Sequence, residues 1–213
     1  MDGRKLPSVT SILGRTSHIF EPSKESSLDW WRSKEPNHRQ ILEEACRRGS
    51  IIHSEIELAL TGKQSTDYTI EEWTELGIPD YMTNLLGFIH EIRGGNTEVE
   101  QVVSHSAGYA GTADLVCEFE GHNTLVDWKT TRHSSVVGEK EKKRSHYKTA
   151  EVQVAAYAAA WNHDTRRPPV TQGLIVVAYD WREPQLIRLD SEILKGRVSD
   201  FAERLSAYQA LEA

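Results

Sequence analysis

Two acidic residues and a lysine lie within otherwise apolar segments of this sequence. Asp127 and Lys129 are two residues apart in the segment TLVDWKTT (124–131), and the alternation of a β-strand puts both side chains on one face. Asp114 lies in the preceding apolar segment, GTADLVCEFE (111–120). Charged groups inside a buried strand cost free energy unless they are paired or bound to something. The pattern therefore indicates either an interior salt bridge or a site for a cation.

The hairpin expected between these two segments brings the charges together. With Gly121 and His122 as a two-residue turn of type II′, Asp114 faces Lys129, and Asp127 is the diagonal neighbour of Asp114. Two such carboxylates repel each other unless a cation lies between them, and hard oxygen ligands suit Mg²⁺ or Mn²⁺. A bound metal can activate water and polarise a phosphoryl oxygen, while Lys129 neutralises charge on the phosphate. The alternative is an interior salt bridge between Asp114 and Lys129.

Two expected helices add polar groups at helical spacing. His53 and Glu57 are four residues apart and share one helix face, as do Gln153 and Tyr157 in an alanine-rich helix. A lone histidine on a helix is more often structural than functional, and Gln153 and Tyr157 could simply form buried hydrogen bonds. The functional interpretation is that the pair contacts a phosphate or the attacking water.

The elements that position these groups follow from the hydrophobic period. Residues 1–37 are expected to be largely irregular, with a short helix near Ser8–Leu13 and the Trp30-Trp31 pair packed onto the body. Helices are predicted over 38–60, 70–92 with a break at 77–79, 149–163 and 191–211, and strands over 97–106, 111–120, 123–131 and 171–180. The last strand is continuously apolar and is predicted to lie inside the sheet. This order predicts an α/β fold.

Composition restricts the class of protein. The chain has 213 residues, 38% of them hydrophobic, and a net charge of −7, which argues mildly against a surface that binds nucleic acid everywhere. A local basic track is still compatible with that charge, in 139–148 and at Arg47-Arg48, although a charge run alone is more often a solvated surface. Two cysteines cannot form a four-thiolate zinc or iron–sulfur site. No signal peptide or membrane span is recognised, so we expect a cytoplasmic protein that is not secreted.

Four motifs in order resemble the PD-(D/E)xK nuclease superfamily in its RecB-like branch. They are G-x-x-x-H (49–53), G-T-A-D (111–114), D-W-K (127–129) and Q-x-x-x-Y (153–157). The segments LPSVTSIL, NHDT (162–165) and GLIVVAY (173–179) also resemble a single-strand-specific DNA exonuclease of that superfamily. The resemblance implies a restriction-endonuclease-like mixed central sheet flanked by helices. It also implies that an added helical region (1–95) forms an arch over the nuclease core (96–213), within a single structural domain.

The resemblance also implies roles for single residues. The metal ligands would be His53, Asp114, Asp127 and the Trp128 main-chain carbonyl, with Glu100 preferred to Glu98 as a further metal group. Lys129 would be the catalytic lysine, acting with Asp114 and Asp127, and Gln153 and Tyr157 would position phosphate and water. The expected DNA-binding residues are Trp30, Trp31, Arg32, Lys34, Arg47, Arg48, Arg132, Lys142, Lys143, Arg144 and Lys148, which combine basic and aromatic character.

The function implied is that of a metal-dependent single-stranded DNA exonuclease. It would thread a free end, leave 5′-phosphate products and act in DNA replication, repair or recombination. We expect Mg²⁺, with Mn²⁺ as a substitute, no iron–sulfur cluster, no nucleotide cofactor, a monomer, and a bacterial or phage source. The alternatives are a flap or structure-specific endonuclease with the same site, a nucleic-acid-binding protein without catalysis, and, less favoured, another phosphohydrolase.

Overall fold

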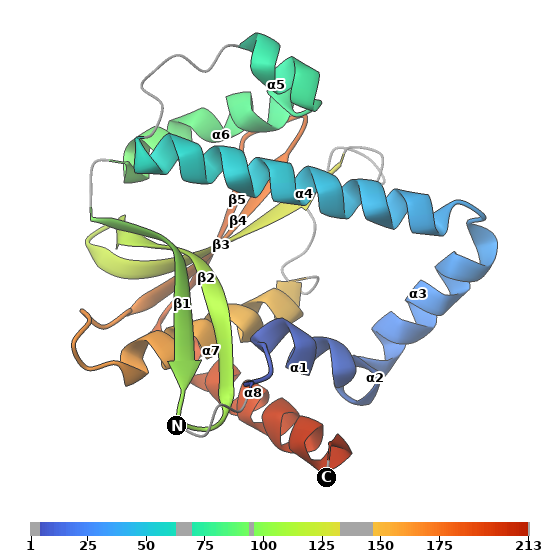
Figure 1. Cartoon of the computed structure of the whole chain (residues 1–213), viewed down its shortest axis with the longest axis vertical. Helices are drawn as coiled ribbons and strands as arrows, with labels where there is room; N and C mark the ends of the chain where they lie inside the picture. The colour runs from blue at the N-terminus through green and yellow to red at the C-terminus, as the bar shows by residue number, and fades with distance from the viewer. Residues whose placement is uncertain (1–4, 63–69, 94–95, 133–146, 213) are drawn as a thin grey trace.

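A mixed β-sheet forms the centre of the computed structural model, which describes residues 5–62, 70–93, 96–132 and 147–212 (Figure 1). Within these residues the sheet has five strands in the order β1-β2-β3-β4-β5. Their bounds are Thr97–His105, Tyr109–Phe119, His122–Thr131, Gln172–Tyr179 and Gln185–Leu189. Strands β3 and β4 are parallel, while the other neighbours are antiparallel. The predicted mixed sheet is therefore confirmed.

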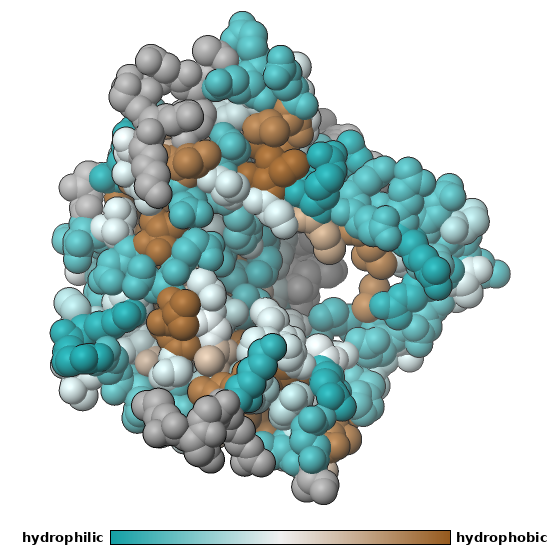
Figure 2. All heavy atoms as spheres, viewed as in Figure 1, coloured by the Kyte–Doolittle hydropathy of each residue, from teal (hydrophilic) through white to brown (hydrophobic). Residues whose placement is uncertain are grey.

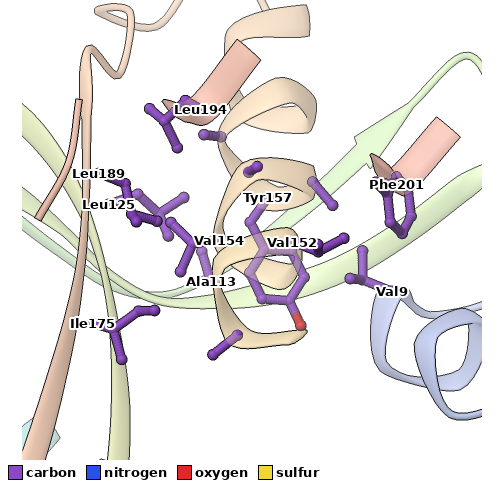
Figure 3. Close-up of a cluster of buried hydrophobic side chains, with 14 of the residues drawn as sticks. Val9, Ala113, Leu125, Val152, Val154, Tyr157, Ile175, Leu189, Leu194 and Phe201 are labelled. Carbon is purple, nitrogen blue, oxygen red and sulfur yellow. The ribbon is translucent and has the colours of Figure 1, made fainter. Parts of the chain in front are cut away.

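Helices cover both faces of this sheet. Their bounds are α1 Val9–Arg15, α2 Ser17–Phe20, α3 Pro22–Lys34, α4 His38–Thr61, α5 Ile70–Leu76, α6 Pro79–Ile92, α7 Lys148–His163 and α8 Ser191–Leu211. One apolar cluster packs α1, α7 and α8 against the sheet (Figure 3), and a second packs α5, α6 and the C-terminal half of α4 against the opposite face. Because both faces are covered, β4 is buried along almost its whole length, as its apolar sequence predicted. None of the described helices is long and apolar enough to cross a membrane.

Helices α2, α3 and the N-terminal half of α4 form an arch that stands away from the body (Figure 1). Figure 2 shows an opening between this arch and the rest of the molecule. No residue from 17 to 51 is buried. An arch is therefore present within the predicted helical region, but it spans only part of residues 1–95, because α1, α5 and α6 pack against the sheet. The expectation that residues 1–37 are largely irregular is wrong. Helix α3 buries no side chain, so its sequence carries no apolar stripe that would reveal it, and Trp30 is 65% exposed rather than packed onto the body.

The β2–β3 turn differs from the expected one. It consists of Glu120 and Gly121, both with positive φ (52° and 77°), which is typical of a type I′ turn, and Phe119 pairs with His122. The register is therefore shifted by two residues from the prediction, and the expected pairing of Asp114 with Lys129 is wrong. A shift of two preserves the faces of both strands. Strand β5 was also missed, because its five residues follow a polar turn and give only a short signal.

Candidate active site

Three carboxylates lie in a row across neighbouring strands. The pairs on either side place Glu100 of β1 opposite Asp114 of β2. The β2–β3 register, whose last pair is Leu115 with Val126, continues toward Asp114 and Asp127 of β3. Glu100 adopts a left-handed backbone conformation (φ 50°), which costs about 1–3 kcal/mol and persists only where the surroundings impose it. Like charges directly opposite each other destabilise a sheet. The row therefore requires compensating positive charge.

Helix α4 brings His53 to this row. Its Nδ1 lies 3.7 Å from Asp114 Oδ2, and one ligand atom each of His53, Glu100 and Asp114 lie within 4.8 Å of one another. Asp114 Oδ2 accepts a hydrogen bond of 3.0 Å from the Trp128 main-chain N–H. Burial lowers the pKa of His53, and this outweighs the opposing effects of Asp127 and the Trp128 carbonyl. The imidazole is therefore neutral near pH 7 and offers a lone pair, as a metal ligand must.

Lys129 and Gln153 hold the third carboxylate. Asp127 is 1% exposed; its Oδ2 lies 2.7 Å from Lys129 Nζ, and its Oδ1 accepts a hydrogen bond of 3.0 Å from Gln153 Nε2. Lys129 Nζ also lies 3.4 Å from Gln153 Oε1. Burial alone would lower the pKa of Lys129, but the charge of Asp127 outweighs it and the net shift is upward. Lys129, whose side chain is half-buried, is therefore a cation fixed between an acid and an amide.

The glycine of the G-T-A-D motif has a packing role against α7. A Cβ at Gly111 would lie 2.4 Å from Cε1 of Tyr157, so only glycine allows this ring to approach β2. Figure 3 shows Tyr157 extending from α7 among buried side chains that include Ala113. Gln153 Nε2 lies 3.4 Å from the Tyr157 hydroxyl, and burial raises the pKa of the phenol. Tyr157 is thus a neutral hydroxyl linked to the acid–lysine pair through Gln153.

These residues fit a divalent cation. Burial and the neighbouring Asp127 raise the pKa of Asp114, so a cation beside this carboxylate would favour its charged form. Asp127 Oδ2 is buried and makes no hydrogen bond of acceptable geometry with the described residues. Carboxylate oxygens and a neutral imidazole suit Mg²⁺ or Mn²⁺. The compact donor group consists of His53, Glu100 and Asp114, whereas the Asp127 carboxylate is turned toward Lys129 and Gln153. That these residues bind metal stays a prediction.

The site opens to solvent beside α4. A pocket of about 340 Å³ is lined by His53, Glu57 and Glu100, together with Gly49, Ser50 and Ser54. Burial and the nearby Glu57 raise the pKa of Glu100. Glu57, which the helical spacing placed beside His53, therefore lies at the mouth of the site.

The predicted DNA-binding residues fall into three groups. Trp30, Arg32, Lys34 and Arg47 are exposed on the arch, and Trp31 is half-buried there. Arg132 and Lys148 are exposed at the end of β3 and the start of α7. Arg48 is half-buried, with its guanidinium 5.9 Å from the Tyr81 ring centroid, so packing is already one of its roles. Lys142, Lys143 and Arg144 lie outside the described residues, and DNA binding by any of these side chains stays a prediction.

The sequence reasoning missed apolar side chains on the arch. Ile19, Phe20, Ile41 and Leu42 are all exposed, and Figure 2 shows apolar atoms at the margin of the opening. The only sequence signal for these side chains was the presence of apolar residues in a segment for which no packing partner was predicted.

Comparison with known proteins agrees with this geometry. The PD-(D/E)XK nuclease superfamily profile matches residues 25–212. The chain belongs to the PD-(D/E)XK nuclease superfamily. It is 31% identical to mitochondrial genome maintenance exonuclease 1 of Mus musculus over 184 residues, covering 82% of this chain and 50% of that protein. The Homo sapiens protein of the same name is 26% identical over 215 residues, covering 95% of this chain and 58% of that protein.

This member of the superfamily spans about half the length of those relatives. A crystal structure of a candidate exonuclease from Eubacterium rectale has a TM-score of 0.48 and 14% identity, covering 79% of this chain and 68% of that one.

Proposed function

We propose that this superfamily member is a metal-dependent exonuclease that hydrolyses single-stranded DNA from a free end. The observation that carries the proposal is the double role of α4. Its N-terminal half forms one side of the arch, and its C-terminal half carries His53 to the row of carboxylates. A strand that passes under the arch is thereby led to the cluster of acids, lysine and amide.

The chemistry would rest on the roles of these side chains. His53, Asp114, Glu100 and the Trp128 carbonyl would hold Mg²⁺ or Mn²⁺, with Asp127 as a further ligand. A bound cation lowers the pKa of a coordinated water and polarises a phosphoryl oxygen. Lys129 would stabilise the negative charge that develops on the phosphate, and Gln153 would keep Lys129 and Asp127 in position. The expected product carries a 5′-phosphate.

The arch supports a preference for single strands. Its exposed side chains combine aromatic and apolar groups, such as Trp30 and Phe20, with basic ones, such as Arg47. Single-strand passages use basic residues to follow the backbone and aromatic rings to stack on bases. The requirement for a free end would come from this passage, because the catalytic cluster itself could cleave an internal bond. We further propose that the enzyme acts as a monomer in DNA replication, repair or recombination.

The test uses a linear single-stranded oligonucleotide labelled at either end, with Mg²⁺, Mn²⁺ or EDTA, and compares wild type with Lys129→Ala. Parallel reactions contain a duplex and a circular single strand. We expect metal-dependent degradation of the linear single strand alone, lost in the variant. Cleavage of the circle would instead show an endonuclease with the same site. No degradation with any metal, together with retained DNA binding, would show a binding protein without catalysis.

A further inference from the structure

The arch is attached to the body at its two ends. Beyond its C-terminal end, α4 buries Ile52, Ile56, Ala59 and Leu60. Before its N-terminal end, α1 buries Val9, Ile12 and Leu13, and the Ala110 N–H of β2 donates to the Pro7 carbonyl. Since no residue from 17 to 51 is buried, apolar packing does not fix the position of α2 and α3. Polar contacts must do so.

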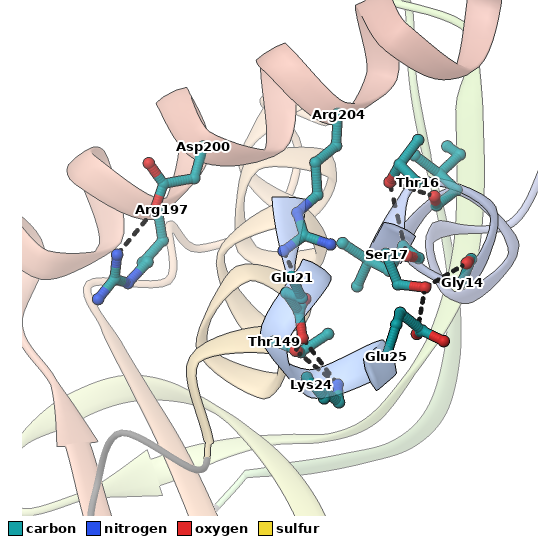
Figure 4. A network of polar contacts seen from close by, with 12 residues as sticks. Gly14, Thr16, Ser17, Glu21, Lys24, Glu25, Thr149, Arg197, Asp200 and Arg204 are labelled. Carbon is teal, nitrogen blue, oxygen red and sulfur yellow. Dashed lines mark hydrogen bonds and ion pairs between the residues drawn. The ribbon is translucent and has the colours of Figure 1, made fainter. Parts of the chain in front are cut away.

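These polar contacts converge on Glu21, between α2 and α3 (Figure 4). Its carboxylate accepts from the Arg204 guanidinium of α8 over 2.5 Å and lies 2.8 Å from the Thr149 hydroxyl of α7. Lys24 Nζ is 2.8 Å from Glu21 and 3.2 Å from the Thr149 hydroxyl. Among the described residues, every hydrogen bond and ion pair that links α2 or α3 to α7 or α8 involves Glu21 or Lys24. We call Glu21, Thr149 and Arg204 the latch.

The latch joins charged groups that are largely shielded from solvent. The Arg204 side chain is only 7% exposed, and its guanidinium lies 5.1 Å from the Phe20 ring centroid. Although burial alone would raise the pKa of Glu21, hydrogen bonds from Lys24, Arg204 and Thr149 lower it to about 2. Removing one partner of such a pair leaves a buried charge without compensation. Loss of Glu21 therefore favours a displaced arch, in which Arg204 can reach water.

We propose that the latch determines which strands this nuclease admits. By holding α2 and α3 against α7 and α8, it keeps the opening wide enough for one strand end and too narrow for a strand folded back on itself. This inference rests on the proposed function. An arch released from the latch admits a doubled-back strand, so a circular single strand becomes a substrate without any change at the acids or Lys129.

The experiment compares Glu21→Gln and the milder Thr149→Val with wild type and with Glu192→Gln. The control removes an exposed ion pair with Lys195 on α8, far in the sequence from the arch. We measure cleavage of linear and circular single strands with Mn²⁺, and hydrogen exchange of residues 22–34 by mass spectrometry. In both latch variants we expect faster hydrogen exchange in residues 22–34 and at least about tenfold faster cleavage of the circle, while cleavage of the linear strand stays as in wild type. Glu192→Gln should match wild type in all three measurements.

The outcomes separate the two proposals. If wild type fails to degrade the linear strand or already cleaves the circle, the proposed function is wrong, and the role of the latch in substrate choice is overturned with it. If wild type behaves as proposed but the folded variants keep its substrate range, the latch proposal alone is overturned. Unchanged exchange in 22–34 in both variants would also overturn it. Should Glu21→Gln not fold, Thr149→Val decides, since it keeps the ion pair and removes only the hydroxyl.

Discussion

The side-chain amide of Gln153 donates to Asp127 Oδ1 over 3.0 Å, so helix α7 fixes a carboxylate on β3. The carbonyl oxygen of the same amide faces the Lys129 ammonium. The side chain of Gln153 thereby orients both Asp127 and Lys129 of the D-W-K motif.

Replacing Gln153 by Ala should slow the reaction more than it weakens metal binding. Removing a residue that orients catalytic groups without binding the metal itself typically lowers activity by about 10–100-fold. We expect kcat for linear single strands to fall in that range, measured with Mn²⁺ at saturating DNA. Gln172→Ala is the control, because Gln172 bonds to Thr124 at the opposite end of β3. Equal losses in both variants would mean that the amide of Gln153 has only a structural role.

The pKa of Asp114 predicts how stability depends on pH without metal. Burial and Asp127 raise this pKa in the folded protein, so the folded state holds a proton that the unfolded state has released. The contribution of Asp114 to stability is therefore most favourable below the ordinary aspartate pKa of about 3.9, and it is lost as pH rises through the raised value. Asp114→Asn should remove this component, raising the Tm in EDTA at pH 7 by about 2–4 °C per kcal/mol relieved.

Thermal unfolding between pH 5 and 8, with EDTA or Mn²⁺, checks this dependence. Mn²⁺ should raise the Tm of wild type and have little effect on Asp114→Asn. An equal response of the two proteins to Mn²⁺ would show that Asp114 does not bind the cation.

Glu100 should contribute to metal affinity although it lies on the outer strand of the sheet. Its left-handed conformation and its proximity to His53 and Asp114 predict that Glu100→Gln weakens Mn²⁺ binding by at least about tenfold, or 1.4 kcal/mol. Isothermal titration calorimetry measures this directly. Glu98→Gln on the same strand should bind as wild type, and a similar loss in both would indicate a general electrostatic effect.

Gly111 should tolerate no side chain. Gly111→Ala places a Cβ 2.4 Å from Tyr157, and overpacking of this kind costs about 1–3 kcal/mol. We expect a lower free energy of unfolding in urea, together with reduced activity. Gly196→Ala in α8 meets no atom within 4 Å and should be neutral or stabilising. The double variant Gly111→Ala, Tyr157→Ala should lose less stability than the sum of its parts, and strict additivity would contradict the contact.

Trp30 should bind DNA without supporting the fold. Its ring is 65% exposed, and stacking on a base contributes about 1–3 kcal/mol. Trp30→Ala should therefore weaken binding of a labelled single strand by fluorescence anisotropy and leave the Tm unchanged. Ile70→Ala, also at an exposed apolar residue but on α5, serves as the control. A drop in Tm without loss of affinity would assign Trp30 a packing role.

Local periodicity predicted part of the candidate site, and the roles of His53 and Glu100 came from the family resemblance. Alternation placed Asp127 and Lys129 on one face of a strand, and helical spacing paired Gln153 with Tyr157. What it could not predict depended on backbone conformations that a sequence does not display. Glu120 takes a left-handed turn position that usually favours other residues, so the register was misplaced by two. Glu100 is left-handed for reasons of tertiary structure, and α3 buries nothing that would create an apolar pattern.

Helix α4 has a mechanical consequence. Its 24 residues span about 36 Å as one rigid rod, with buried side chains only from Ile52 onward. Its C-terminal half is packed into the body beside His53, whereas its outer half is held through α3 and the latch. Tension applied by a DNA strand to the N-terminal half of α4 would tilt the His53 imidazole relative to Asp114. Binding of the strand under the arch and the geometry of the reaction centre would then change together, because both depend on the position of α4.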